Sequence, residues 1–91
     1  MFSLYTAFDV QIEMKEFIKK SRKEKNLTVE QLAKQSGVPY GTIRKFEKSG
    51  EISFRQFLML FEVVGSLSQL RKSIQESKPE PRSIEEVLRD A

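Results

Sequence analysis

The chain contains no cysteine and no histidine among its 91 residues. These two residue types supply most protein ligands of transition metals and the nucleophile or general base of many hydrolases. Their absence argues against such metal sites and against Ser-His or Cys-His catalysis, and it leaves no thiol for a disulfide bond. We therefore expect no catalytic residue, no metal site, no cofactor and no enzymatic activity.

Long apolar runs are also missing from the sequence. Hydrophobic residues make up 38% and charged residues 32% of the chain, and no apolar run approaches the roughly 18 residues that a membrane helix needs. Residues 1–5 lack the basic region and the apolar core of a signal peptide. These absences predict a single globular domain in the cytoplasm, without a membrane partner.

The charge of the chain is modest in total but uneven along its length. Lys and Arg number 16 against 13 Asp and Glu, which gives a net charge of +3 and an isoelectric point near 9.3. Residues 1–50 hold ten of the basic and six of the acidic residues. The N-terminal half therefore carries the positive field.

Residues 27–50 have the pattern of a helix-turn-helix, two short helices joined by a tight turn that contains glycine. Thr28 and Gln31 have the spacing of a capping box at the start of the first helix. Gly37 can adopt the left-handed conformation that ends this helix. Pro39 suits the first turn of the second helix, because the amide hydrogen that it lacks would have no intrahelical partner there. The inward residues are expected to be Val29, Leu32 and Ala33 in the first helix and Ile43 and Phe46 in the second.

The outward side of this second helix is small at its start and basic further along. Its residues are Gly41, Thr42, Arg44, Lys45 and Lys48. A helix of this shape and charge suits a groove flanked by phosphates, so the pattern points to DNA.

Three further helices are predicted around the motif. One covers about residues 9–25, and its lysine-rich outer face either is simply solvated or touches the DNA backbone. The next begins after Ser53, which has the capping-box spacing with Gln56, and it is apolar around much of its circumference, as expected for the hydrophobic centre of the domain. Gly65 closes it, and Ser66 with Gln69 opens the last of the three. The apolar residues of these last two helices are Phe54, Phe57, Leu58, Leu60, Phe61 and Val64, then Leu67, Leu70 and Ile74.

Both ends of the chain are predicted to lie outside this domain of residues 9–77. Residues 1–8 form a short arm, either a strand that packs on the core or on a second subunit, or a partly disordered segment. Residues 78–91 begin with a linker that contains Pro79 and Pro81. A short amphipathic helix follows Ser83, and it either folds back on the domain or waits for a partner.

Residues spread from the first predicted helix to the end of the fourth match one known pattern. They are Ile18, Arg22, Leu27, Thr28, Leu32, Ala33, Gly37, Val38, Thr42, Ile43, Glu47, Gly50, Leu60, Val64 and Gly65. Each match is weak alone, but together and at this spacing they are specific. Over about residues 14–74 the chain thus resembles the phage repressor/Cro-like (Xre-type) helix-turn-helix family. More loosely, the short chain with its proline-bearing tail resembles antitoxins of toxin–antitoxin operons, including the HipB-like group.

The first resemblance implies an all-α, five-helix, lambda-repressor-like DNA-binding domain, usually dimeric, whose third helix enters the major groove. By position, Tyr40, Gly41 and Lys45 fall where the family reads bases. Lys45 is the strongest candidate, because its ammonium can donate to guanine O6 and N7. Tyr40 either packs on a thymine methyl, or donates a hydrogen bond to a phosphate, or simply covers the turn.

The resemblance also implies supporting contacts around these bases. Thr42 and Arg44 fall close by, for phosphates or flanking bases, and Lys48 and Thr28 complete the expected DNA contacts. Arg22 and Glu47 fall where family members form an ion pair between the first and third helices. A buried pair of this kind costs roughly 3–5 kcal/mol when one partner is removed, so it would fix the third helix in place.

Three departures from the family pattern concern the DNA contacts. Val29 stands where many members have a glutamine that holds a phosphate, and Pro39 replaces the usual serine or threonine cap of the third helix. The run 47–50 is one residue longer than the family's usual Glu-x-Gly, so the following turn must differ.

The resemblance predicts a sequence-specific regulator of transcription, a repressor that binds double-stranded DNA at a palindromic operator as a homodimer. Such a protein belongs in the cytoplasm, with the nucleoid when bound. The looser resemblance predicts an antitoxin that represses its own operon and holds a toxin through residues 83–91 or 1–8. The alternatives are a phage-type repressor without a toxin and a module that binds only other proteins.

Overall fold

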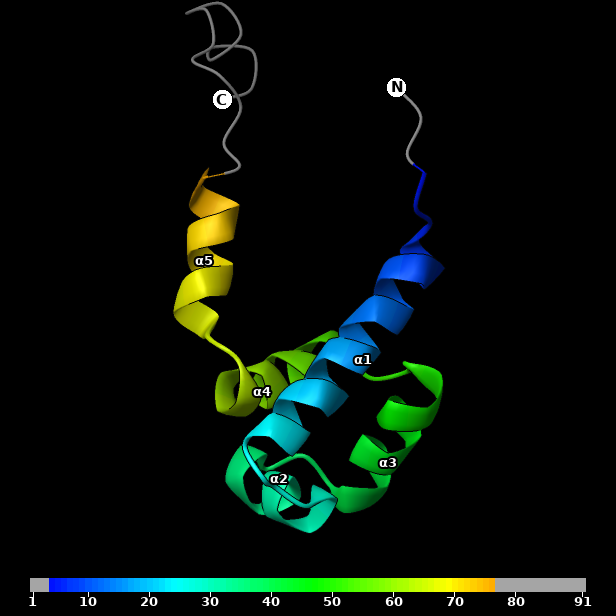
Figure 1. Ribbon diagram of the computed structural model, residues 1–91, viewed down its shortest axis with the longest axis vertical. Helices are drawn as coiled ribbons and strands as arrows, with labels where there is room; N and C mark the ends of the chain where they lie inside the picture. The colour runs from blue at the N-terminus through cyan, green and yellow to red at the C-terminus, as the bar shows by residue number, and fades with distance from the viewer. Residues whose placement is uncertain (1–3, 77–91) are drawn as a thin grey trace, which may run out of the picture.

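The computed structural model describes residues 4–76 and folds this part into five α-helices joined by short connections (Figure 1). They are α1 (Ala7–Glu24), α2 (Val29–Ser36), α3 (Tyr40–Ser49), α4 (Phe54–Val64) and α5 (Leu67–Glu76). The part described contains no strand, which confirms the all-α, five-helix prediction. Within residues 4–76, no helix combines the length and the apolar character needed to cross a membrane.

The first helix begins earlier than the sequence indicated. Thr6 caps it with a reciprocal capping box: the backbone N–H of Asp9 donates to Thr6 Oγ1 at 3.1 Å, and the N–H of Thr6 donates to Asp9 Oδ2 at 3.0 Å. Ala7 and Phe8 are therefore helical, and the predicted arm of residues 1–8 is wrong for these two positions. Residues 1–3 and the predicted tail of residues 78–91 lie outside the described part.

The connections on either side of α2 follow the predicted signals. Thr28 and Gln31 form a reciprocal capping box, with distances of 3.1 Å and 2.8 Å. Gly37 ends α2 in the left-handed conformation, with φ of 81°. Pro39 lies one residue before α3 rather than in its first turn, because its ψ of 144° is extended, and its side chain makes no capping bond.

The two later capping boxes are only half formed. The N–H of Gln56 donates to Ser53 Oγ at 3.1 Å, and the N–H of Gln69 donates to Ser66 Oγ at 3.2 Å. The side chain of Gln56 accepts a hydrogen bond from the Ser53 hydroxyl, at 3.2 Å, instead of reaching back to the backbone. One orphan amide at the start of each helix is satisfied in this way.

Helices α1 to α4 share one apolar core. Its most buried side chains are Ile18, Leu32, Val38, Ile43, Phe46 and Leu60. Three phenyl rings link α4 to α3 in this core, with centroid distances of 5.9 Å from Phe61 to Phe57 and 6.0 Å from Phe57 to Phe46. Phe17 of α1, which is 43% exposed, stacks on Phe61 from the edge of the core at 5.6 Å. The prediction that α4 forms the hydrophobic centre is correct for Leu60, Phe61 and Val64, which are buried. It is wrong for Phe54, which begins α4 and is 78% exposed.

Two segments project from this core on the same side. They are the first turns of α1 and the whole of α5, and both point away from α2 and α3 (Figure 1). Helix α5 has no buried residue and packs on α4. Of its predicted apolar residues, Leu67 and Leu70 are partly covered, while Ile74 is 67% exposed.

Candidate nucleic-acid interface

Helix α3 presents a continuous stripe of exposed residues on the surface of the domain. Ile43 and Phe46 fill the core, and the side of α3 opposite them faces outward. Gly41, Arg44, Lys45 and Lys48 are exposed, and their spacing of three and four residues places them along one side of the helix. No heavy atom would lie within 4 Å of a Cβ at Gly41, so the start of this stripe is open to a close approach.

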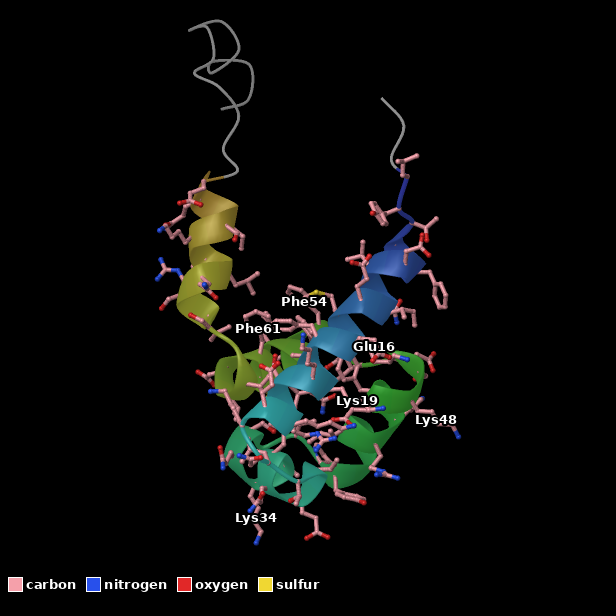
Figure 2. The ribbon with its side chains drawn as sticks, in the orientation of Figure 1. Glu16, Lys19, Lys34, Lys48, Phe54 and Phe61 are labelled. Carbon is pink, nitrogen blue, oxygen red and sulfur yellow. The ribbon has the colours of Figure 1, made fainter. Side chains whose placement is uncertain are left out.

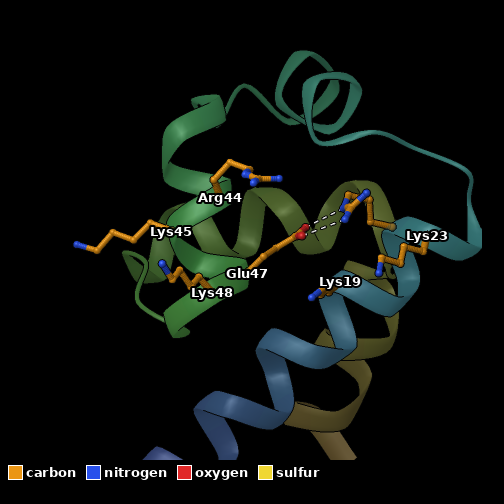
Figure 3. Close-up of a pocket in the computed structure, with 7 residues that line it drawn as sticks. Lys19, Lys23, Arg44, Lys45, Glu47 and Lys48 are labelled. Carbon is orange, nitrogen blue, oxygen red and sulfur yellow. Dashed lines mark hydrogen bonds and ion pairs between the residues drawn. The ribbon is translucent and has the colours of Figure 1, made fainter.

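A buried ion pair fixes α3 against α1. Arg22 Nε donates to Glu47 Oε2 at 2.7 Å, and Arg22 Nη2 donates to Glu47 Oε1 at 3.0 Å (Figure 3). The two side chains are only 11% and 9% exposed. Arg22 Nη1 also donates to the carbonyl of Leu27 at 2.7 Å, which ties the same guanidinium to the turn before α2. A planar guanidinium used in this bidentate way sets orientation as well as distance.

The end of α3 is held by a second contact with α1. Gly50 ends the helix with φ of 83°, a left-handed conformation that favours glycine. Its carbonyl accepts a hydrogen bond from Gln11 Nε2 at 2.7 Å, and a Cβ at this position would lie 3.4 Å from Gln11 Cγ. The end of α3, after the additional residue between Glu47 and Gly50, therefore lies close against α1.

An open groove of about 750 Å³ runs between α1 and α3. We call it the basic groove, and its lining residues are Lys19, Arg22, Lys23, Arg44, Lys45, Glu47 and Lys48. Glu47 is the one acidic residue among them, and the ion pair with Arg22 occupies its carboxylate. Lys19 and Lys23 reach the groove from α1, opposite the basic residues of α3 (Figure 3). Basic side chains from two helices are therefore gathered at this groove.

The predicted site residues of α3 differ in their surroundings. Arg44, Lys45 and Lys48 lie together at the basic groove. The guanidinium of Arg44 lies 6.0 Å from the centroid of the Tyr40 ring, and that ring is 47% exposed. Lys45 Nζ lies 3.9 Å from a carboxylate oxygen of Glu51, but both side chains are about two-thirds exposed, and such a pair contributes little stability.

Two residues predicted to contact DNA, Thr42 and Thr28, lie outside the exposed stripe of α3. Thr42 is half-buried, next to the exposed stripe. Thr28 lies at the start of α2, where its hydroxyl oxygen caps the helix and its own hydrogen remains available as a donor.

Lys19 and Lys23 are the residues of this site that sequence reasoning left undecided. Their spacing with Arg22 places all three on one side of α1, so a signal was present. That α3 lies opposite this side is a tertiary fact, which local spacing does not contain. No cluster of acidic, Cys or His side chains suited to a metal ion occurs among residues 4–76.

A model of a helix-turn-helix protein family matches residues 18–72, which is more than half of the chain. The chain belongs to the Xre/Cro-like helix-turn-helix family. No curated protein and no solved structure matches it. The matched span of this Xre/Cro-like protein runs from the middle of α1 into α5 and contains the ion pair and the basic groove. Membership of the family makes the chain a DNA-binding regulator of transcription.

Proposed function

We propose that this Xre/Cro-like protein represses transcription by inserting α3 into the major groove of a palindromic operator, as a homodimer. The observation that carries the proposal is the exposed basic stripe of α3, which a buried ion pair with α1 holds in place. A reading helix gains specificity only when its position is fixed, because base-edge hydrogen bonds tolerate little displacement. Such a repressor acts in the cytoplasm, with the nucleoid when it is bound.

Each residue of the stripe has a role that suits its place. Gly41 lets the backbone approach the groove closely, since it adds no side chain at the start of α3. Lys45, further along, donates to guanine O6 and N7. Arg44 and Lys48 lie beside it and contact phosphates. Tyr40 packs on a thymine methyl or donates a hydrogen bond to a phosphate at the rim, and the contacts of Thr42 and Thr28 are to the DNA backbone.

A dimer follows from the same proposal, because a palindrome offers two half-sites about 34 Å apart. The surface proposed for the second copy lies on the side from which α1 and α5 project. Phe8, Phe54 and Ile74 expose 64%, 78% and 67% of their surface there, and Figure 2 shows Phe54 at the base of the projecting segments. Exposed large apolar side chains are unfavourable in water unless a partner covers them. The reading helix at the other end then remains free for DNA.

Selection of duplexes from a random library, followed by binding titrations, tests the proposal. We expect one palindromic sequence to be enriched. The variant Lys45→Ala should lose about 1–3 kcal/mol of binding to that sequence and little binding to a scrambled duplex, because a base contact discriminates and a phosphate contact does not. The matched control is Lys34→Ala, an exposed lysine that points away from the domain at the end of α2 (Figure 2). Failure to enrich any sequence at low salt would contradict the proposal.

We propose a second candidate function, that of an antitoxin, on the exposed apolar side chains at the N-terminal end, one of which, Phe8, also belongs to the proposed dimer surface. Leu4 and Phe8 are 89% and 64% exposed at the N-terminal end of the described chain, which is the kind of surface that a protein partner covers. The other predicted toxin-binding segment, residues 83–91, lies outside the described part. Co-purification of the full chain with the product of the neighbouring gene tests this function. Co-purification should be lost in Leu4→Ser/Phe8→Ser or on deletion of residues 78–91. If the partner is still recovered in full when both changes are made, the result counts against the antitoxin function.

A further inference from the structure

We infer that the basic groove is a binding channel for the phosphate backbone of DNA, in which Lys19 and Lys23 of α1 hold a strand from the side opposite α3. This inference rests on the proposed insertion of α3 and adds a second helix to the interface. It assigns to the α1 lysines a contribution to affinity that is independent of sequence.

The arrangement of the groove favours an extended anion over a small one. Lys19 and Lys23 are one helical turn apart on α1, and Arg44 and Lys48 are one turn apart on α3. All four residues line the same open space, Lys19 and Lys23 from the α1 side and Arg44 and Lys48 from the α3 side (Figure 3). The side chain of Lys48 projects outward from α3, away from α1 (Figure 2), so this lysine lies at the rim of the groove. A groove with a basic pair on each wall fits a chain of phosphates, which carries its charges at regular intervals.

Four of the six basic side chains of the groove have no carboxylate partner within the described part of the protein. Among residues 4–76, no carboxylate oxygen lies within 4.0 Å of the charged nitrogens of Lys19, Lys23, Arg44 or Lys48. By contrast, Lys20 and Lys72 each lie within 4.0 Å of a glutamate one turn further along their own helices. Like charges gathered around one space repel each other, and a polyanion removes that repulsion while releasing its own counterions.

The basic groove also shares residues with the exposed stripe of α3. This overlap favours DNA as the source of the phosphates. Arg44, Lys45 and Lys48 line the groove and belong to the exposed stripe of α3 as well. A duplex that receives α3 in its major groove has a phosphate strand on each flank of that helix. The basic groove lies along one such flank. A free phosphate would meet the same side chains, but without the second contact along α3.

The salt dependence of DNA binding tests the inference. The variant is Lys19→Gln/Lys23→Gln, and the matched control is Lys20→Gln/Lys34→Gln, which removes the same charge at exposed lysines outside the groove. Each lost phosphate contact should reduce the slope of log K against log salt concentration by about 0.9, so we expect a reduction of about 1.8 per protomer. Affinity at 0.1 M salt should fall on the order of 10- to 100-fold per protomer bound, equally for the selected and a scrambled duplex. In the control variant, the change in the salt slope and the change in affinity should each be less than half of those in Lys19→Gln/Lys23→Gln.

Further measurements separate the possible outcomes. Lys19→Arg/Lys23→Arg keeps the charge and should keep the slope, and thermal unfolding verifies that all variants fold. An unchanged slope in the glutamine variant, or an equal change in the control, overturns the inference while the proposed function stands. A loss confined to the selected duplex also overturns it, because it would indicate base reading. Absence of binding by the wild-type chain to any duplex overturns both.

Discussion

At the scale of single residues, the ion pair of Arg22 and Glu47 holds α3, the proposed reading helix, against α1. Three hydrogen bonds of 2.7–3.0 Å join Arg22 to Glu47 and to the Leu27 carbonyl, so one side chain connects α1, α3 and the turn before α2. The benefit of such a pair is positional, since the cost of desolvating two charges offsets much of their attraction. Its geometry is therefore more informative about function than about stability.

Removal of one partner of this pair should be costly. In Glu47→Ala, Arg22 remains buried and unpaired, so we expect the free energy of unfolding to fall by about 3–5 kcal/mol in urea titrations. The double variant Arg22→Met/Glu47→Leu should recover most of this loss, because it leaves no isolated charge. A loss below about 1 kcal/mol in Glu47→Ala would show that the pair is open in solution. DNA binding should fall in the double variant even if stability returns, since α3 is no longer oriented.

At the scale of elements, the starts of the helices show which structural features can be predicted from the sequence. Thr28 and Gln31 predict the start of α2 correctly because both halves of the capping box are local. The equivalent box of Thr6 and Asp9 was missed, since aspartate replaces the usual glutamate or glutamine at its third position. Its recognition would have placed the start of α1 correctly.

The two boxes should differ in their effect on stability. Helix α2 has 8 residues and contributes Val29 and Leu32 to the core, so Thr28→Ala should lower the free energy of unfolding by about 1 kcal/mol in denaturant titrations. Thr6, which caps α1, and residues 7–10 at its start are all exposed. Thr6→Ala should therefore lower the free energy of unfolding by less than about 0.5 kcal/mol and instead speed amide exchange at Asp9. Equal losses in the two variants would mean that the first turn of α1 is part of the cooperative unit.

Features that depend on several elements were not predictable from the sequence. The helical period places Phe54 among the apolar residues of α4, but only the neighbouring helices determine that this residue is uncovered. In the same way, spacing puts Lys19 and Lys23 on one side of α1, whereas the basic groove exists because α3 lies across from them. The exposed residues of α3 were predictable because its buried side, Ile43 and Phe46, is apparent from the sequence.

The whole described molecule has two ends with different chemistry. One end holds α2, α3 and the basic groove, and the other holds the first turns of α1 and all of α5 (Figure 1). The first is basic, and the second exposes apolar side chains. This polarity suits a protein that binds a polyanion at one end and a second copy at the other.

Dimerisation can be tested at the end that carries α5. Ile74→Glu places a charge on a helix without buried residues, so it should leave the fold intact and yield the monomer mass of 10.6 kDa in sedimentation experiments. Gln35→Glu adds the same charge to α2 and should leave the dimer unchanged. Affinity for the palindrome should fall about 100-fold or more in Ile74→Glu, because the two half-sites are then bound independently. A wild-type chain that is monomeric both free and on DNA would rule out the homodimer.

The exposed ring at the start of α3 has a consequence for how the molecule can be observed. The chain has no tryptophan and two tyrosines, Tyr5 and Tyr40, so its ultraviolet emission comes from these two phenol rings. Tyr40 is 47% exposed at the start of the reading helix, with the Arg44 guanidinium 6.0 Å from its ring. With Tyr5 replaced by phenylalanine, the single remaining fluorophore stands where a nucleobase would arrive. The protein thus carries an intrinsic optical reporter of the occupancy of α3, and no dye has to be attached near the DNA.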